Sequence, residues 1–182
     1  MSDERLHFLL GIHNHQPVGN FESVVDETIL RAYHPFLETI DRAGRDLPVT
    51  VHCSGGLLES LKARARHTFD LLGRLAAEGR VELLGGGFYE PILALLPDWD
   101  KVGQIQALAQ FLKSHWGVTP RGMWLAERIW EPQLPRALRE AGVEFVLVDD
   151  SHFALAGLDP ETLGGYYLTE EQGATVAVFP IN

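Results

Sequence analysis

The chain has 182 residues, with 15 Lys and Arg against 25 Asp and Glu, and its formal net charge is -10 when histidine is neutral. This length suits one domain of about 100–200 residues with a sizeable core. The acidic balance leaves no basic stripe for phosphates or anionic lipid, so we expect no nucleic-acid partner and no membrane partner. A neutral, sugar-like substrate suits this charge better.

The cysteine count and the N-terminal residues bear on the cellular compartment. Cys53 is the single cysteine, which excludes an intrachain disulfide and a Cys-rich zinc site. The chain begins with acidic residues at Asp3 and Glu4, whereas a secretory signal begins with basic ones. No run approaches the roughly 18 apolar residues of a membrane span. We therefore expect a cytoplasmic protein, and the sequence carries no signal for a particular oligomeric state.

Strand-like and helix-like segments alternate along the chain. Apolar runs that end at glycine or polar residues predict strands, the first of them buried on both faces, and apolar positions at helical spacing predict helices. The last part differs, because two β-rich runs flank a polar turn at 170–173 and predict a hairpin. The predicted strands are 6–12, 48–53, 80–84, 121–126, 144–148, 166–168 and 175–179, and the predicted helices are 21–43, 57–78, 100–115 and 133–141.

This alternation predicts an α/β fold, in which βα repeats build a parallel sheet covered by helices. A closed barrel of eight such units takes about 250 residues, so the chain resembles an incomplete barrel. We find no internal repeat or linker and interpret residues 1–182 as a single domain. The sequence ends directly after a strand-like run, which we interpret as a truncated chain, although a complete open sheet is the alternative.

Reactive side chains follow the carboxyl ends of the predicted strands, where such folds place their sites. We weigh each one against a structural role, and for His52 and Glu90 the two interpretations stand about even. An adjacent acidic pair beside His152 is also a possible metal set. The strand-end residues are His13, His15, His52, Glu82, Glu90, Trp124, Glu127, Arg128, Trp130, Asp149, Asp150 and His152.

The segment around Glu127 is the most informative. Aromatic faces stack on the apolar faces of sugar rings, and carboxylates carry out glycoside chemistry. Trp124 and Trp130 flank Glu127, and we expect the neighbouring Arg128 to hold its carboxylate ionised, as a nucleophile requires. The alternative, at about even odds from spacing alone, is an ion pair of Glu127 with Arg128 at the rim and two tryptophans in the core.

Several motifs occur in one order along nearly the whole chain. They are HNHQP at 13–17, GRVELL at 79–84, GGFYEP at 86–91, WLAERIW at 124–130, VDDSHF at 148–153 and AVFPI at 177–181. Together they resemble glycoside hydrolase family 57, the α-glucan-acting family of amylases, 4-α-glucanotransferases, branching enzymes and amylopullulanases. The last two stretches resemble its 4-α-glucanotransferase branch.

The resemblance implies a (β/α)7 barrel, a retaining mechanism, an α-glucan or malto-oligosaccharide substrate, and no cofactor or metal. It implies that Glu127 is the nucleophile. By the same matching, the other motif residues are expected to contact substrate, and His13 and Asp150 join them from their places at strand ends. We expect His15 in the pocket, facing opposite to His13. The expected substrate-binding residues are therefore His15, Glu82, Trp124, Arg128, Trp130, His13 and Asp150.

The family's acid/base is an aspartate in a fourth motif of the DGEKFG type, and residues 1–182 contain no such motif. We therefore expect residues 1–182 to be the N-terminal part of the catalytic domain, with the acid/base beyond residue 182, or else a shortened member. Two other functions stay open. One is a non-catalytic sugar-binding remnant. The other is a metal-dependent polysaccharide deacetylase that would use His13, His15, Asp149, Asp150 and His152.

Overall fold

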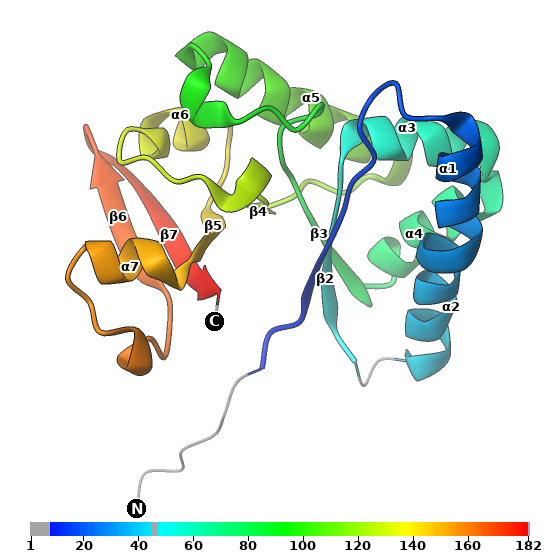
Figure 1. The fold of residues 1–182 in the computed structure, drawn as a ribbon, viewed down its shortest axis with the longest axis horizontal. Helices are drawn as coiled ribbons and strands as arrows, with labels where there is room; N and C mark the ends of the chain where they lie inside the picture. The colour runs from blue at the N-terminus through cyan, green and yellow to red at the C-terminus, as the bar shows by residue number, and fades with distance from the viewer. Residues whose placement is uncertain (1–7, 45–46, 182) are drawn as a thin grey trace, which may run out of the picture.

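The structure, a computed structural model, describes residues 8–44 and 47–181 as two neighbouring sheets (Figure 1). The first has the order β1-β2-β3 and the second the order β4-β5-β7-β6. All pairings are parallel except that of β6 with β7. The strands are β1 (Gly11–Asn14), β2 (Val49–Cys53), β3 (Val81–Leu84), β4 (Gly122–Met123), β5 (Phe145–Asp149), β6 (Tyr167–Glu171) and β7 (Ala174–Ile181).

Two glycines join the sheets. Gly85 forms a parallel bridge with Met123, in which the Gly85 amide donates to the carbonyl of Gly122 at 2.8 Å and the Trp124 amide donates to that of Gly85 at 2.9 Å. A Cβ atom at Gly122 would stand 2.1 Å from the Phe145 ring, so only glycine fits there. The strands therefore follow one another in one series that is open between β1 and β6.

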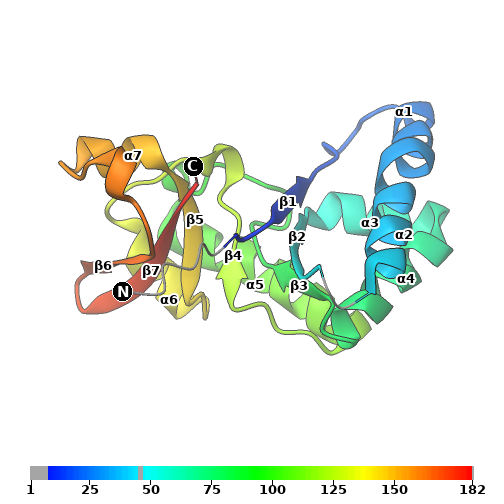
Figure 2. The ribbon, with the colours of Figure 1, turned by 90° about the horizontal axis from the view of Figure 1, so that it is seen from below.

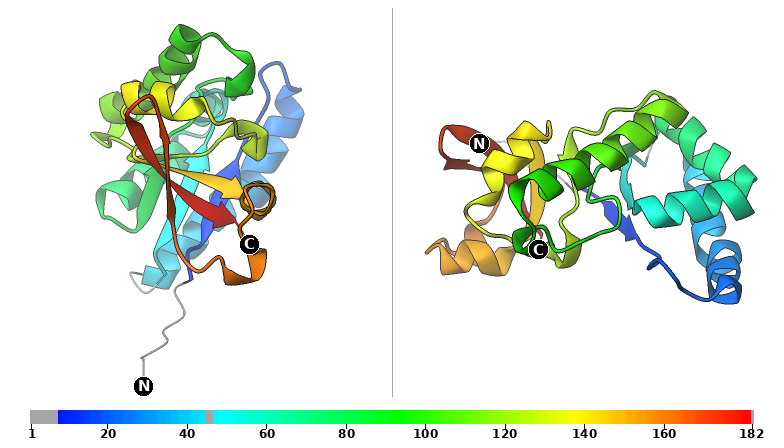
Figure 3. Two further views of the ribbon diagram at one scale, coloured as in Figure 1. Left: turned by 90° about the vertical axis from the view of Figure 1, so that its left-hand side faces the viewer. Right: turned by 90° about the horizontal axis from the view of Figure 1, so that it is seen from above.

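Most of the helices lie on one side of this series, while α7 lies on the other side of β5 and β7 from α6 (Figures 2 and 3). The first four pack on β1–β3, while α5 runs across both sheets and α6 lies against β7 (Figure 3). None of the helices in the described ranges is long and apolar enough to cross a membrane. The helices are α1 (Glu22–Thr28), a π-helical turn (Ile29–Tyr33), α2 (His34–Ala43), α3 (Gly55–Arg64), α4 (Arg66–Ala77), α5 (Asp98–Trp116), α6 (Leu134–Glu140) and α7 (Asp150–Leu155).

The hydrophobic core has two parts that α5 connects. Leu108 of α5 belongs to the cluster between α1–α4 and the first sheet, and Ile105 belongs to the cluster between α6, α7 and the second sheet. Because α5 supplies side chains to both clusters, the hydrophobic core continues past the junction of the two sheets. The two sheets consequently share one continuous helical layer.

Strand alternation separates this core from the site. Val51 and Leu83 are paired neighbours in β2 and β3 and lie in the first cluster. On each strand the residues before and after Val51 or Leu83 point to the opposite face, because successive side chains of a strand alternate. On that face His13 pairs in register with His52, and Glu82 pairs with Thr50. One face of the sheet thus serves folding, and the other presents polar groups.

The parallel α/β arrangement confirms the fold predicted from the sequence, with local differences. β1 begins at Gly11 and Leu9 is exposed, because this edge strand pairs with β2 alone and is not buried on both faces; Leu6 lies outside the described residues. β4 has two residues instead of six, because the chain turns away after Trp124. Ala65, at φ -138°, divides the helix predicted over 57–78. The predicted hairpin is present, and its second strand also pairs with β5.

Two helical glycines provide a matched test of this packing. A Cβ atom at Gly73 of α4 would lie 2.3 Å from the Trp116 indole, whereas one at Gly103 of α5 meets nothing within 4 Å. We expect Gly73→Ala to lower the free energy of unfolding by about 1–3 kcal/mol through overpacking. Gly103→Ala should raise it by about 0.5–1 kcal/mol through helix propensity. Denaturant melts of both variants test this, and two shifts of the same sign would contradict it.

Candidate active site

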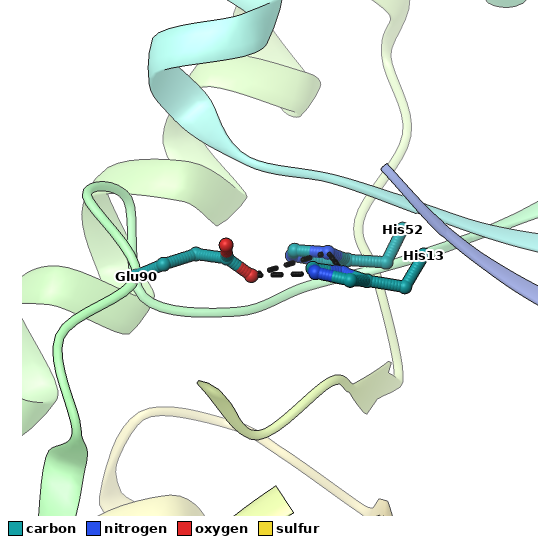
Figure 4. A group of neighbouring side chains, drawn as sticks. All are labelled: His13, His52 and Glu90. Carbon is teal, nitrogen blue, oxygen red and sulfur yellow. Dashed lines mark hydrogen bonds and ion pairs between the residues drawn. The ribbon is translucent and has the colours of Figure 1, made fainter. Parts of the chain in front are cut away.

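Four strand ends bring side chains together on the face that the helices leave uncovered. His13 and His15 come from β1 and the residue after it, His52 from β2, Glu90 from the turn after β3, and Trp124 from the segment after β4. In Figure 4 the Glu90 carboxylate points at the rings of His13 and His52. The parallel sheet explains the convergence, because all its strands end at the same edge.

Glu90 is the centre of this cluster. Its Oε2 atom lies 2.5 Å from Nδ1 of His15. Its Oε1 atom lies 3.7 Å from Nδ1 of His13 and 3.6 Å from Nδ1 of His52. The Glu90 side chain is only 8% exposed and that of His52 is fully buried, and Oε1 has no hydrogen-bond partner among the described residues. One buried carboxylate therefore faces three imidazoles.

The turn after β3 is shaped to place this carboxylate. Glu90 has φ 52°, in the left-handed region, and its amide donates to the carbonyl of Gly87 at 3.1 Å. A Cβ atom at Gly86 would lie 2.5 Å from Nε2 of His52, so the chain passes the histidine ring only because Gly86 lacks a side chain. The glycine run 85–87 therefore combines a sharp turn with a close contact.

Burial sets the charge state of the cluster. It raises the pKa of Glu90 to about 7, and the Glu127 carboxylate is the second cause of that rise. Burial lowers the pKa of His13 to about 4, with His15 and Arg128 adding to the effect, and lowers that of His52 well below its ordinary value. Burial also lowers the pKa of His15, against the attraction of Glu127. The Glu127 carboxylate thus contributes to the pKa shifts of both Glu90 and His15.

Glu127 itself lies on a 3₁₀ turn, Ala126–Arg128, with an exposed side chain. Glu127 and Arg128 have φ of 54° and 53°, which for non-glycine residues costs about 1–3 kcal/mol each. Strain of this kind persists where the surrounding structure holds it. It turns two consecutive residues out of the strand direction and leaves the Glu127 carboxylate free at the rim.

Arg128 does not form the ion pair with Glu127 that the sequence left open as the alternative. Nε of Arg128 lies 2.7 Å from Oδ1 of Asp149, and its guanidinium carbon lies 5.9 Å from the centre of the Trp124 ring. No ion pair of Arg128 with Glu127 occurs within residues 8–44 and 47–181. Because Asp149 ends β5, this contact connects the strained turn to the next strand.

The remaining predicted residues divide into two groups. Trp124 stacks on His13, with ring centres 4.5 Å apart and planes 12° apart, so it belongs to the cluster. Trp130 packs against the second hydrophobic core. Asp150 starts α7 and makes no hydrogen bond or ion pair within the part of the chain that the structure describes.

Glu82, one of the expected substrate-binding residues, is exposed, because the face that it shares with His52 has no helix over it. One sequence expectation needs correction. His13 and His15 were expected to face opposite sides, yet both approach Glu90 and their rings stack at 6.2 Å. Residues two apart in an extended chain share a face.

Glu90 and His52 are the residues that sequence reasoning undervalued. The available signal was the carboxylate in GGFYEP, immediately after a strand and a glycine run. Within the described ranges, His13, His52 and Glu90 are also the one set of three side chains whose ligand atoms could hold a metal ion, all within 4.8 Å of one another. The set expected for a deacetylase, with Asp149, Asp150 and His152, does not converge there.

Comparison with known proteins assigns the chain to a family. The sequence profile of glycosyl hydrolase family 57 matches residues 9–182. The chain belongs to this family. It is 49% identical over 177 residues to alpha-amylase 1 of Dictyoglomus thermophilum, covering 97% of this chain and 26% of that protein. It is 45% identical over 179 residues to the 4-alpha-glucanotransferase of Thermococcus litoralis, covering 98% of this chain and 27% of that protein.

Solved structures extend this family-57 comparison. The crystal structure of the Thermococcus litoralis 4-alpha-glucanotransferase superposes with a TM-score of 0.93 at 45% identity, over 98% of this chain and 28% of that one. A family 4 carbohydrate esterase from Streptomyces lividans superposes with a TM-score of 0.51 at 12% identity, over 81% of this chain and 67% of that one. That second likeness shows the fold alone. The chain spans about a quarter of the length of the curated family-57 relatives.

The raised pKa of Glu90 makes stability depend on pH. Below the ordinary value of 4.5, folded and unfolded chains both hold this proton; between 4.5 and about 7 only the folded chain does. Stability contributed by Glu90 is therefore lost as pH rises from 4.5 to about 7. Glu90→Gln cannot lose a proton, so the Tm of the variant minus that of the parent should grow by several degrees from pH 5 to pH 8.

Metal-free buffers and thermal melts at each pH measure this difference. The histidines act with the opposite sign below pH 6.5, so the part of the change between pH 6.5 and pH 8 reports on Glu90. A difference that stays constant across this range would contradict a buried Glu90 with a raised pKa.

Proposed function

We propose that the chain is the nucleophile-bearing part of an α-glucan-active retaining glycosidase or 4-α-glucanotransferase. The observation that carries this proposal is the placement of Glu127, exposed on a strained turn and electrostatically coupled to the Glu90–His15 pair. Its support is the identity of 44–49% to proteins named alpha-amylase and 4-alpha-glucanotransferase.

In this mechanism Glu127 attacks the anomeric carbon of an α-linked glucose unit. A bond forms from the carboxylate oxygen to that carbon, and the bond to the leaving oxygen breaks as an acid gives that oxygen a proton. The same acid, now a base, removes a proton from water or from a sugar hydroxyl that attacks the glycosyl-enzyme. Water gives hydrolysis and a sugar gives transfer.

The acid/base is a second carboxyl group about 5–5.5 Å from the nucleophile. Glu90 does not suit this role although its pKa is raised, because both its oxygens face histidines and its side chain is buried. We place the acid/base in chain beyond residue 182, consistent with relatives about four times as long. The segment 1–182 then forms the N-terminal part of one catalytic domain.

The neighbouring side chains are proposed to bind the glucan. Nδ1 of His15 is held by Glu90 at 2.5 Å, which leaves Nε2 of this partly exposed ring for a sugar hydroxyl. Glu82 lies on the same uncovered face as His52 and is available to a deeper part of the substrate. Arg128 and Trp124 hold the turn, and Trp130 and Asp150 are more distant supports. The substrate is a malto-oligosaccharide or α-glucan.

A cytoplasmic site of action is part of this proposal. Its support is that Cys53 is the single cysteine of the sequence, so the chain has no intrachain disulfide of the kind found in oxidising compartments.

The nucleophile is testable without the acid. A glycosyl fluoride needs little acid assistance because fluoride leaves readily, so α-maltosyl fluoride should yield a covalent glycosyl-enzyme on residues 1–182. We expect one maltosyl unit per chain by intact mass, located on Glu127 by peptide mapping. Glu127→Gln should abolish the adduct, because an amide is not a competent nucleophile.

Glu131→Gln is the matched control, since Glu131 is exposed on the same segment and should keep the adduct. Labelling that persists in Glu127→Gln, or that is lost equally in Glu131→Gln, would contradict the assignment. Binding of maltoheptaose with no adduct in the parent chain would favour a sugar-binding remnant instead.

A further inference from the structure

We propose that His13, His52 and Glu90 form a binding site for a divalent transition metal of the Zn²⁺ or Co²⁺ type. The glycosidase mechanism above uses no metal, so this site is a separate property of the same cluster and stands independently of the proposed function. The three side chains converge from β1, β2 and the turn after β3 (Figure 4).

The spacing of the ligand atoms fits such an ion. Nδ1 of His13 and Nδ1 of His52 are 2.8 Å apart, and they lie 3.7 Å and 3.6 Å from Oε1 of Glu90. A point equidistant from these three atoms is about 2.0 Å from each, which is the Zn–N and Zn–O bond length in proteins, and it lies in the plane of the three atoms. A tetrahedral site with bonds of this length separates its ligand atoms by about 3.3 Å. Binding therefore requires the two Nδ1 atoms to move apart by about 0.5 Å and to release the proton of their hydrogen bond.

An unsatisfied acceptor points into the same space. The Glu90 side chain is more than nine-tenths buried. Its Oε1 atom nevertheless has no hydrogen-bond partner among the described residues. A buried carboxylate oxygen with no partner is costly. A cation bound between Oε1 and the two Nδ1 atoms would remove that cost, which no other described group does.

The ligands are already held by neighbours of the kind found around metal sites. Oε2 of Glu90 is bound to Nδ1 of His15 at 2.5 Å, and the His13 ring lies flat against Trp124 at 4.5 Å. Such outer contacts fix ligand orientation before the ion arrives. The His13 side chain is 29% exposed, so an ion can reach the site from its side.

The donor set selects the class of ion. Two imidazole nitrogens and one carboxylate oxygen suit borderline metals such as Zn²⁺ and Co²⁺, whereas Mg²⁺ and Ca²⁺ prefer all-oxygen sites with more ligands. Three protein ligands leave one tetrahedral position for water. Because the ligands belong to two strands and a turn, a bound ion would connect these elements. An ion that binds only the folded chain stabilises it by mass action.

The test uses the chain freed of metal by chelator and then titrated with CoCl₂ and, separately, ZnCl₂. We expect one equivalent of tightly bound metal, the visible d–d absorption of tetrahedral Co²⁺, and a Tm that rises with metal and falls back with EDTA. Magnesium should give no shift. The absence of stoichiometric binding, or an octahedral Co²⁺ spectrum, would overturn the proposal.

Variants assign the site. Glu90→Gln keeps the shape of the side chain and His13→Ala changes a partly exposed ring, so each should fold in EDTA yet lose at least tenfold in metal affinity. If one variant fails to fold, the other decides. His152→Ala, which removes a histidine of the alternative deacetylase set, should bind as the parent does.

A surface pair provides the second control. The rings of His34 and His67 lie 4.5 Å apart, and His34 lies 3.5 Å from Glu38, so this pair could bind metal adventitiously. His67→Ala should leave affinity unchanged. Loss of binding in His67→Ala or His152→Ala, with full binding in Glu90→Gln and His13→Ala, would overturn the assignment to the Glu90 cluster.

Discussion

A carboxylate buried among imidazoles is the constraint on which the rest of the site depends. Moving such a group out of water is costly unless hydrogen bonds or opposite charge compensate. For Glu90 the compensation comes from His15, which contacts one carboxylate oxygen. The other oxygen faces His13 and the buried His52 without a hydrogen bond among the described residues. These partners belong to different strands, so the position of one carboxylate fixes how three strand ends approach each other. The Glu127 carboxylate on the neighbouring turn adds to the rise in the pKa of Glu90.

The division of the sheet into two faces makes this arrangement compatible with folding. Val51 and Leu83 carry the apolar packing on the helix side, and the alternate residues carry the polar groups. The polar groups of the site therefore lie outside the hydrophobic core. The two sheets are joined at Gly85 and Gly122 by backbone hydrogen bonds alone, so this junction uses no side chain. Side chains near the joint, Trp124 above all, are therefore left for the site.

Periodicity was sufficient to predict the fold class, most helices and the hairpin, because burial patterns of period 2 and 3.6 are local properties of the sequence. It failed where a partner distant in the chain decides. β1 is an edge strand, which depends on how many strands lie beyond it. Arg128 binds Asp149 and not its neighbour Glu127, because the strained backbone turns the two side chains apart. Glu90 gains its importance from three histidines that lie 38 to 77 residues earlier.

The near contact between Gly86 and His52 has an evolutionary consequence. A methyl group at position 86 would overlap the imidazole, so position 86 cannot gain a side chain while His52 is present. The two positions form an epistatic pair: a smaller residue at 52 is the only permissive background for a side chain at 86. Because His52 also faces Glu90, that first step would disturb the charge balance of the site. Combinatorial libraries that vary position 86 alone will recover glycine.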